Sequence, residues 1–458
     1  PSGQNKRVSR AEGLARLNSL AALSGKGIGT TPKAQTMLIA APESRHEPFP
    51  LSDTQQAYRL GRDASLEGGG AAMQSYLELR CDSLDVERLQ AALDALVARH
   101  EMLRAVVLEE GAQRILPLPL RIPVTIEDLG ALDESGQAAR LAEISRSMTA
   151  EVSDLRVWPQ SEARFSRLGG GEKNASGVLH LRFDQWAMDG RSFQIVTREL
   201  ARLYEDPEVP LPPLDVSFRD YLTAVEREKE TPEYANSLEY WRKKLDTLAG
   251  PPSLPRREST RGASLDFSPV DQDEHCAVIR RSDVLDEADT AALLKESAKR
   301  GVTHVSALGA IYAGVLAFWS GNSRFTLNSP RFNRNLSWHP GLNDVVGEFA
   351  TFTLHEYDAS LGTTVMEQAE AFQEEAWGTL THGRVSGMTL LRELARRRGG
   401  MSAAAMPVVF TAMPDASDGG SFEDDLRPLG ILQRLYGSTP QVWLDCVFSV
   451  FSNKLHMY

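Results

Sequence analysis

The sequence is poor in cysteine and has no long apolar run. Cys81, Cys276 and Cys446 are its only cysteines, and they lie far apart with no Cys-x-x-Cys pair. This argues against a disulfide framework or a zinc knuckle and favours a reducing compartment. No apolar run approaches the length of a membrane span, and residues 1–46 lack the apolar core of a secretory signal. We therefore predict a cytoplasmic protein that makes no use of a membrane.

The chain also lacks the marks of nucleic-acid, metal and nucleotide binding. Its formal net charge is −12, and no run of Lys and Arg forms a basic patch. No two histidines have the spacing of metal ligands, and the glycine run at 169–171 lacks the Lys-Ser/Thr ending of a phosphate loop. With 42% hydrophobic and 24% charged residues, the composition is that of a globular protein. A length of 458 residues exceeds one ordinary core, so we expect two lobes.

Three regions are predicted along the chain. Residues 1–46 open with a capping-box pattern at Ser9 and leucines at helical spacing, which predicts a linker helix or a docking segment. Residues 47–255 form the first lobe, and the proline-rich stretch at 250–255 marks its end. Residues 256–458 form the second lobe. The patterns predict helices at 84–99, 193–204, 303–319 and 365–380, and strands at 276–279, 325–328, 349–354, 407–411 and 441–450.

The most informative segment is 183–192, Phe-Asp-Gln-Trp-Ala-Met-Asp-Gly-Arg-Ser. Apolar alternation precedes it and a helical pattern follows, which predicts a strand, an exposed corner and a helix. Such corners commonly present functional side chains on a rigid scaffold. Asp184, Asp189 and Ser192 give the spacing Asp-x-x-x-x-Asp-x-x-Ser. His180 falls within the preceding strand, so we interpret it as a strand residue and not as a base at the corner.

This spacing resembles the signature of heterocyclization domains of nonribosomal peptide synthetases. Related condensation domains carry His-x-x-x-Asp-Gly at the same corner, and Gln185 stands here in the histidine position. Six further segments resemble motifs of that family in the family's order: 49–62, 99–104, 240–255, 325–349, 407–411 (Pro-Val-Val-Phe-Thr) and 438–445 (Ser-Thr-Pro-Gln-Val-Trp-Leu-Asp). The resemblance covers about residues 47–458, and it implies that the end of the family's fold is missing from this chain.

The resemblance implies an α/β fold of two chloramphenicol-acetyltransferase-like lobes, forming a pseudo-dimer with a central tunnel. It further implies an enzyme that condenses an upstream carrier-bound acyl or peptidyl thioester with a carrier-bound Cys, Ser or Thr. The product is then cyclodehydrated to a thiazoline or oxazoline. The implied partners are upstream and downstream carrier proteins, an adjacent adenylation domain and an upstream synthase subunit that residues 1–46 would engage. No cofactor is expected on the domain itself, since phosphopantetheine arms come with the carriers.

Ring closure on an amide needs a donor to the carbonyl oxygen, a base for the nucleophile and an acid for the departing water. Asp445 is our first candidate, because strand alternation around it turns Val442, Leu444 and Cys446 to the core and Asp445 to the other face. Thr411 ends an apolar strand and offers a hydroxyl that both donates and accepts. The family match implies cyclodehydration roles for both residues, and a role for Asn333 in orienting the substrate carbonyl.

The corner residues are predicted to be largely structural. Asp189 is expected to form an ion pair, with Arg334 as a candidate partner, and Ser192 is expected to cap the following helix. For Asp184 two interpretations stay open, a structural one and the orientation of the attacking amine. Gln185 and Gln441 are assigned to substrate binding by their places in the motifs.

Two alternatives remain beside heterocyclization: amide condensation without ring formation, and a catalytically idle platform that gathers carrier proteins. The sequence departs from the family at Cys446-Val447, where His-Gln is usual, and at Glu348 and Ala350, where Gly-Asp-Phe-Thr is usual. These departures flank the predicted tunnel, and they bear on whether the chain condenses only.

Overall fold

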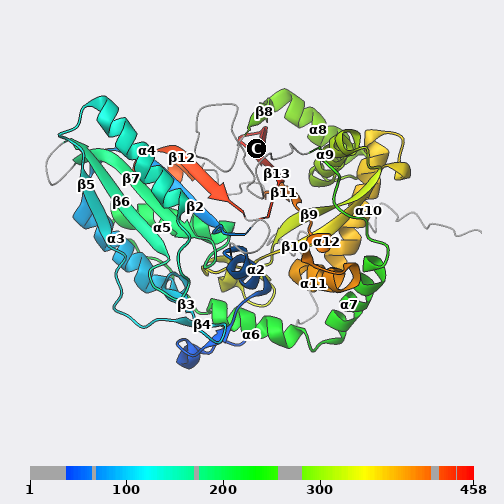
Figure 1. Ribbon diagram of the computed structural model, residues 1–458, viewed down its shortest axis with the longest axis horizontal. Helices are drawn as coiled ribbons and strands as arrows, with labels where there is room; N and C mark the ends of the chain where they lie inside the picture. The colour runs from blue at the N-terminus through cyan, green and yellow to red at the C-terminus, as the bar shows by residue number, and fades with distance from the viewer. Residues whose placement is uncertain (1–37, 64–68, 170–174, 256–280, 414–421, 440) are drawn as a thin grey trace, which may run out of the picture.

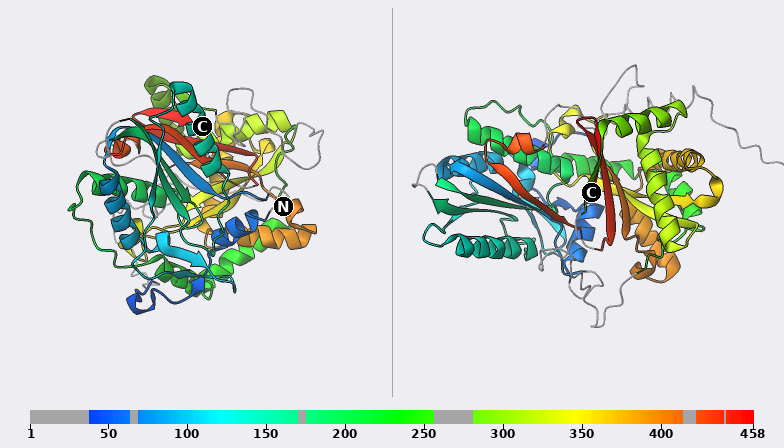
Figure 2. Two further views of the ribbon diagram at one scale, coloured as in Figure 1. Left: turned by 60° about the vertical axis from the view of Figure 1, so that its left-hand side comes forward. Right: turned by 90° about the horizontal axis from the view of Figure 1, so that it is seen from above.

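The computed structural model describes residues 38–63, 69–169, 175–255, 281–413, 422–439 and 441–458. Two lobes lie side by side, each built on its own β-sheet with helices packed against it (Figures 1 and 2). No single helix of these residues has the length and apolar character of a membrane span, although α8 (Glu287–Lys299) and α9 (His304–Ser320), bent by 103° at their junction, pass that test as a pair. The predicted N-terminal helix and the predicted strand at 276–279 lie outside the described residues.

The first lobe contains a five-stranded sheet in the order β12-β2-β7-β6-β5. Helices α3 and α5 cover one face of this sheet, and α4 lies on the other face. Asp85 caps α3 and Asp133 caps α4 through side-chain hydrogen bonds to backbone N–H groups, which fixes where these helices begin. The elements are β2 (Gln74–Leu84), α3 (Val86–Arg99), β5 (Val124–Asp128), α4 (Glu134–Ala150), β6 (Ser161–Gly169), β7 (Ala175–Asp184), α5 (Gly190–Glu205) and β12 (Ile431–Ser438).

The second lobe contains a six-stranded sheet in the order β10-β9-β11-β13-β14-β8. Its apolar face packs on α9 and α10, and the opposite face of β10 packs on α7 and α11. The elements are α7 (Pro232–Leu245), β8 (Asp283–Leu285), α8 (Glu287–Lys299), α9 (His304–Ser320), β9 (Arg324–Phe332), β10 (Ala350–Asp358), α10 (Val365–Thr381), α11 (Gly387–Arg398), α12 (Met401–Ala404), β11 (Val408–Ala412), β13 (Leu444–Phe451) and β14 (Lys454–Met457).

The remaining elements lie at the junction of the lobes or connect them. A capping box at Ser52 starts α2, and a second one at Ser217 starts α6. A three-stranded sheet in the order β1-β4-β3 lies beside α2. These elements are η1 (Pro42–Ser44), β1 (Phe49–Pro50), α2 (Asp53–Gly61), η2 (Glu101–Arg104), β3 (Ala105–Val107), β4 (Ala112–Ile115), α6 (Phe218–Glu228), η3 (Pro340–Asn343), η4 (Ala359–Leu361) and α13 (Phe422–Leu426).

Most predicted elements are present, but one strand was placed too early. Helices α3, α5, α9 and α10 and strands β9, β10 and β11 lie within a few residues of the predicted ranges. The strand predicted at 441–450 begins only at Leu444. Gln441 has a positive φ of 63°, a left-handed conformation that does not continue a strand. Leu444 is also 40% exposed, so its predicted place in the core is wrong, whereas Cys446 does pack against the apolar core.

Strand β12 crosses between the lobes. It follows second-lobe elements in the chain, yet it pairs antiparallel with β2, from Ile431 opposite Arg80 to Ser438 opposite Gln74. The chain then returns to the second sheet as β13 (Figure 1). A boundary at residue 255 therefore does not separate the lobes completely, because residues 431–438 complete the first sheet. The boundary itself stays a prediction, since residues 256–280 lie outside the described part of the chain.

Candidate active site

Asp445 and Thr411 meet on neighbouring parallel strands. In the register of β11 and β13, Val409 lies opposite Asp445 and Thr411 lies opposite Val447. All four therefore face the same side of the sheet, away from the core that Phe410 and Cys446 contact. The Thr411 hydroxyl Oγ1 donates a hydrogen bond to Asp445 Oδ1 at 2.9 Å. The two residues for which the family match implies cyclodehydration roles are thus hydrogen-bonded to each other, and the roles themselves stay predictions.

The environment of Asp445 favours its protonated form more than water does. Solvent reaches the side chain, but protein atoms crowd it on its other sides. The resulting desolvation raises the pKa of Asp445 above its ordinary value, and the hydrogen bond from Thr411 opposes this by stabilising the carboxylate. A carboxyl group whose pKa moves toward neutrality is suited to both accepting and donating a proton.

A thiol, and not an imidazole, stands next to this carboxyl group. Burial raises the pKa of Cys446 to about 11, and the nearby Asp445 adds to the effect. Cys446 is therefore a neutral thiol at physiological pH. It also points to the core, away from the face that holds Asp445.

Each aspartate of the corner is held by an arginine. Asp184 accepts hydrogen bonds from Arg62 and from the backbone N–H of Trp186, at 2.9 Å for the latter. Asp189 is paired with Arg334 at 2.7 Å, which confirms the predicted ion pair. Both carboxylates are almost fully buried. Because both oxygens of Asp184 are occupied within the protein, the geometry favours its structural interpretation over orientation of an amine.

The predicted helix cap at the corner was assigned to the wrong residue. Asp189 is the N-cap of α5, because its Oδ1 accepts a hydrogen bond from the backbone N–H of Ser192 at 2.7 Å. Ser192 instead joins the lobes: its hydroxyl donates to the carbonyl oxygen of Gly347 at 2.9 Å and accepts from Arg334 at 2.6 Å. The residue types alone did not decide between the two positions, because Asp and Ser are both preferred at a helix N-cap.

Arg334 links the corner to the second lobe. Besides Asp189 and Ser192, its guanidinium donates to the carbonyl oxygens of Leu342 and Val345, at 2.8 and 2.6 Å. It also lies over the ring of Phe349, with 4.0 Å between guanidinium carbon and ring centroid. These contacts compensate the buried charge through the terminal nitrogens, although Nε has no hydrogen-bond partner among the described residues. They favour the predicted structural role of Arg334.

Among the described residues, neither Asn333, Gln185 nor Gln441 is hydrogen-bonded to Thr411 or Asp445. Asn333 follows β9, and its Nδ2 donates to the hydroxyl of Tyr221 at 3.0 Å. Gln185 is buried, with its Nε2 bonded to Ser75 at 2.7 Å. Gln441 is exposed in the turn before β13. Their roles toward substrate stay predictions.

His180 lies in β7, as predicted, and its ring contacts Tyr76 and Ser166 inside the first lobe. Burial lowers the pKa of His180 to about 4, so the ring is neutral at physiological pH. Both ring nitrogens of His180 are hydrogen-bonded within the first lobe.

One acid near the corner was not identified from the sequence as a site residue. Glu348 is buried, its Oε1 accepts from the backbone N–H of Ala350 at 2.9 Å, and its surroundings raise its pKa well above the ordinary value. Desolvation is the main cause, and the neighbouring charge of Asp189 adds to it. The only signal in the sequence was that a glutamate stands where the resembled motif has an aspartate. The surroundings of Glu348 at the lobe junction therefore favour the neutral form of its carboxyl group.

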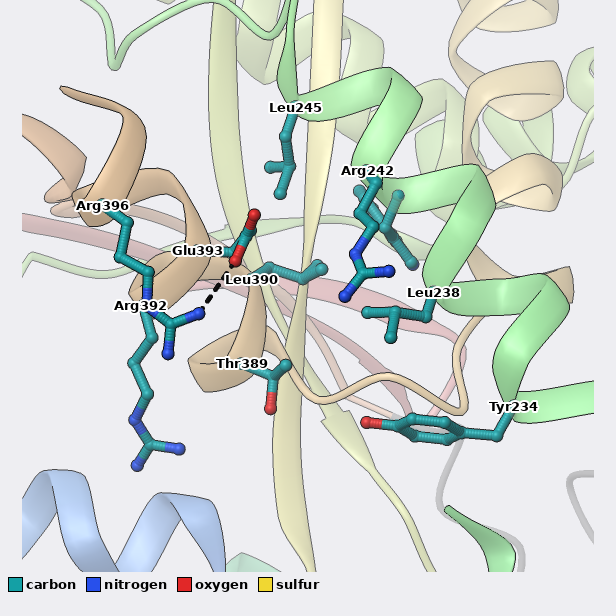
Figure 3. Close-up of a pocket in the computed structure, with 10 residues that line it drawn as sticks. Tyr234, Leu238, Arg242, Leu245, Thr389, Leu390, Arg392, Glu393 and Arg396 are labelled. Atoms are coloured by element: carbon teal, nitrogen blue, oxygen red, sulfur yellow. Dashed lines mark hydrogen bonds and ion pairs between the residues drawn. The ribbon is translucent and has the colours of Figure 1, made fainter. Parts of the chain in front are cut away.

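A separate cavity of about 240 Å³ lies between α7 and α11 (Figure 3). Its walls combine apolar side chains such as Leu245 and Leu390 with Arg242, Arg392 and Arg396. In Figure 3, Arg396 is joined to Glu393 by an ion pair. None of the predicted catalytic residues lines this cavity, so it is distinct from the Thr411–Asp445 pair.

A family model described as the condensation domain matches residues 46–417. The chain belongs to the condensation domain family. This condensation domain is 34% identical over 421 residues to pyochelin synthetase PchF of Pseudomonas aeruginosa, and 32% identical over 439 residues to phenyloxazoline synthase MbtB of Mycobacterium tuberculosis. These alignments cover 89% and 94% of this chain but only 21% and 29% of the relatives. The chain thus spans less than a third of either one.

Solved structures confirm the fold and the resemblance to cyclization domains. The cyclization-docking bidomain of EpoB from Sorangium cellulosum superposes with a TM-score of 0.80 and 30% identity, covering 98% of this chain and 85% of that one. The first condensation domain of the calcium-dependent antibiotic synthetase gives 0.64 and 22%, covering 90% of each chain. The predicted α/β architecture of two acetyltransferase-like lobes is confirmed, and this condensation domain has the cyclization-domain form.

Proposed function

We propose that this domain joins two carrier-bound thioesters and then closes a five-membered ring. The upstream acyl or peptidyl group forms an amide with the amine of a Cys, Ser or Thr thioester. The thiol or hydroxyl then attacks the new amide carbonyl, and water leaves to give a thiazoline or oxazoline. Phosphopantetheine arms on carrier proteins would present both substrates. An adjacent adenylation domain and a cytoplasmic location complete the proposal.

The hydrogen bond between Thr411 and Asp445 is the observation that carries this proposal. Simple amide formation from a thioester needs no dehydrating acid, because the thiolate of the carrier is itself a good leaving group. Loss of water from an amide-derived intermediate requires a proton donor to the departing oxygen. Asp445, with its raised pKa and its hydroxyl partner, is suited to give and take that proton.

The occupant of the histidine position supports the same reading. Gln185 replaces the imidazole at the corner, and its amide is used inside the first lobe by Ser75. The two corner aspartates are neutralised by Arg62 and Arg334. The titratable group left open to solvent on the shared face of β11 and β13 is Asp445. The corner therefore serves to shape the site, and Asp445 supplies the proton transfer.

The test is reconstitution with separate carrier proteins. One carrier bears an acyl donor, and the other bears Cys, Ser or Thr in three parallel reactions that contain the whole chain. Mass spectrometry of the carrier-bound product distinguishes the linear amide from the ring, which is lighter by one water. We expect the ring with at least one acceptor. A product that always keeps its water would support condensation alone, and carrier binding with no product would support an idle docking platform.

A further inference from the structure

The face of the second sheet that holds Asp445 continues onto the neighbouring strand β14, where it carries two aromatic rings. The backbone N–H of each of Val447 and Tyr458 donates to the carbonyl oxygen of the other, at 3.0 Å in both cases, so these residues are direct cross-strand partners. Val447 is also opposite Thr411 in the register of β11 and β13. Thr411, Val447 and Tyr458 therefore form a row across three strands, and their side chains share one face of the sheet.

His456 lies two residues before Tyr458 on β14 and shares this face. The alternate residue of β14, Leu455, contacts the core under α9 and α10, as Cys446 of β13 does. Because side chains alternate along a strand, His456 and Tyr458 face away from that core, as Asp445 does. The two rings are nearly parallel, with an interplanar angle of 14° and 6.3 Å between their centroids. They form a flat-sided unit that we call the β14 ring pair.

An acid of the first lobe lies near the β14 ring pair. Phe422 of α13 packs against Phe193 of α5, with 5.7 Å between the ring centroids, so α13 is attached to the first lobe. The next residue is Glu423. Desolvation and the charge of Lys454 lower the pKa of His456, while the charge of Glu423 opposes them. Glu423 is therefore close to His456, which places the ring pair at the junction of the lobes.

The β14 ring pair is close enough to the Thr411–Asp445 pair to touch a group bonded to the reacting carbonyl. Tyr458 lies one strand over from β13 and two residues further along than Asp445. With strands about 4.8 Å apart and a rise of about 3.3 Å per residue, the two backbones are about 8 Å apart. Val447, which is partly exposed, lies between them. A ring attached directly to the reacting carbonyl would therefore lie over Val447 and against Tyr458.

Of the two substrates, only the upstream one can place a ring there. The acceptor is Cys, Ser or Thr, and its short side chain is itself the nucleophile of ring closure. The group on the other side of the reacting carbonyl belongs to the upstream acyl or peptidyl substrate. Aromatic rings attract one another, in offset parallel or edge-to-face arrangements, by more than the apolar area that they bury. The β14 ring pair therefore favours an upstream group that is itself aromatic.

We propose that Tyr458 and His456 are specificity-determining residues that bind an aromatic ring bonded directly to the carbonyl of the upstream acyl group. This inference rests on the proposed function and adds a substrate class to it, the aryl and heteroaryl thioesters. Tyr458 is nearer to the reacting carbonyl, and His456 extends the flat surface away from it. Neither ring transfers a proton. The contact acts from the first step onward, because the upstream group is bound before the amide exists.

The test is a competition between benzoyl and cyclohexanecarbonyl groups loaded on the same upstream carrier protein. The two groups have the same number of carbon atoms, and only the first is planar and aromatic. Mass spectrometry measures the ratio of their products, with linear amide and ring counted together. Tyr458→Leu should lower the benzoyl share of this ratio by about three- to tenfold. Tyr458→Phe keeps the ring and should leave the ratio unchanged. Intrinsic reactivities cancel, because the ratio is compared between variants.

Met457→Ala is the matched control. Met457 lies between the two rings in sequence, faces the opposite side of β14 and is 40% exposed, so its loss should not change the ratio. Thermal unfolding of each variant verifies that the fold is kept. An unchanged ratio in Tyr458→Leu, an equal loss of both products, or the same change in Met457→Ala would overturn the inference. If the unsubstituted protein forms amide but no ring, the ring-closing function fails, while the ratio still tests this inference.

Discussion

The acids near the lobe junction differ in what holds them. Asp184 and Asp189 are each paired with an arginine, which fixes their positions. Glu348 is desolvated, which raises its pKa and favours its neutral form. Asp445 has an uncharged partner, Thr411, and contact with solvent, so its protonation state is free to change during a reaction. This contrast assigns proton transfer to one carboxyl group and architecture to the others.

The hydrogen bond from Thr411 lowers the pKa of Asp445 against the effect of desolvation. Thr411→Val removes the hydroxyl at similar volume, so the pKa of Asp445 should rise further. The inflection in the pH profile of ring closure should then move to higher pH, whichever protonation state of Asp445 acts. Quenched reactions at a series of pH values measure this inflection. Thr353→Val, which removes a buried hydroxyl without a partner on β10, should leave the inflection in place.

The Asp189–Arg334 pair should be a stability feature. Asp189→Asn keeps an oxygen for capping α5 but leaves the buried Arg334 without a counter-charge. We expect a loss of about 3–5 kcal/mol in the free energy of unfolding, measured by urea titration. Amide formation and ring closure should fall together, with no change in the pH inflection. An unchanged unfolding free energy would show that the ion pair does not hold the lobes.

At the scale of elements, hydrophobic periodicity predicted the helices and strands whose formation depends on the local sequence. The helix at 303–319 and the strand at 407–411 were visible because their apolar patterns are regular and glycine or proline bounds them. The start of β13 was missed because Gln441 takes a positive φ, which its sequence does not announce. The convergence of Thr411 and Asp445 came from the family motif, since strand pairing across 34 residues leaves no local signal.

Helices α9 and α10 depend on a close approach at Gly309. A Cβ added there would lie 2.5 Å from a ring carbon of Phe372, whereas at Gly314 the nearest atom is 3.7 Å away. Gly309→Ala should therefore destabilise the protein by about 1–3 kcal/mol through overpacking. Gly314→Ala, on the same helix, should stabilise it by about 0.5–1 kcal/mol through helix propensity. Denaturant unfolding compares them, and equal effects would contradict the packing account.

At the scale of the whole molecule, β12 makes the two lobes interdependent. Its pairing with β2 joins residues about 350 positions apart. Nothing in the hydrophobic pattern of either strand identifies the other as its partner. Sequence reasoning supplied two lobes from length and their architecture from resemblance, but not this exchange. The exchange matters for function, because the segment that returns from β12 leads directly to Asp445.

This exchange predicts that the lobes unfold together. Each sheet would lose a structural support if the other opened, since β12 belongs to the first sheet while β13, next in the chain, lies inside the second. Hydrogen exchange by mass spectrometry along a guanidinium series should show β7 and β9 losing protection at the same denaturant concentration. Two well-separated midpoints would indicate lobes that are stable on their own.

The central claim is that Asp445 performs the proton transfers of ring closure. The most direct measurement follows the carrier-bound product of Asp445→Asn by mass spectrometry in a single turnover, beside the unsubstituted protein. Asparagine keeps the shape and the hydrogen bond with Thr411 but neither gains nor loses a proton. We predict normal amide formation with ring closure slowed by about 10²–10⁴-fold, seen as product that retains its water. Ring closure at an undiminished rate would contradict the account.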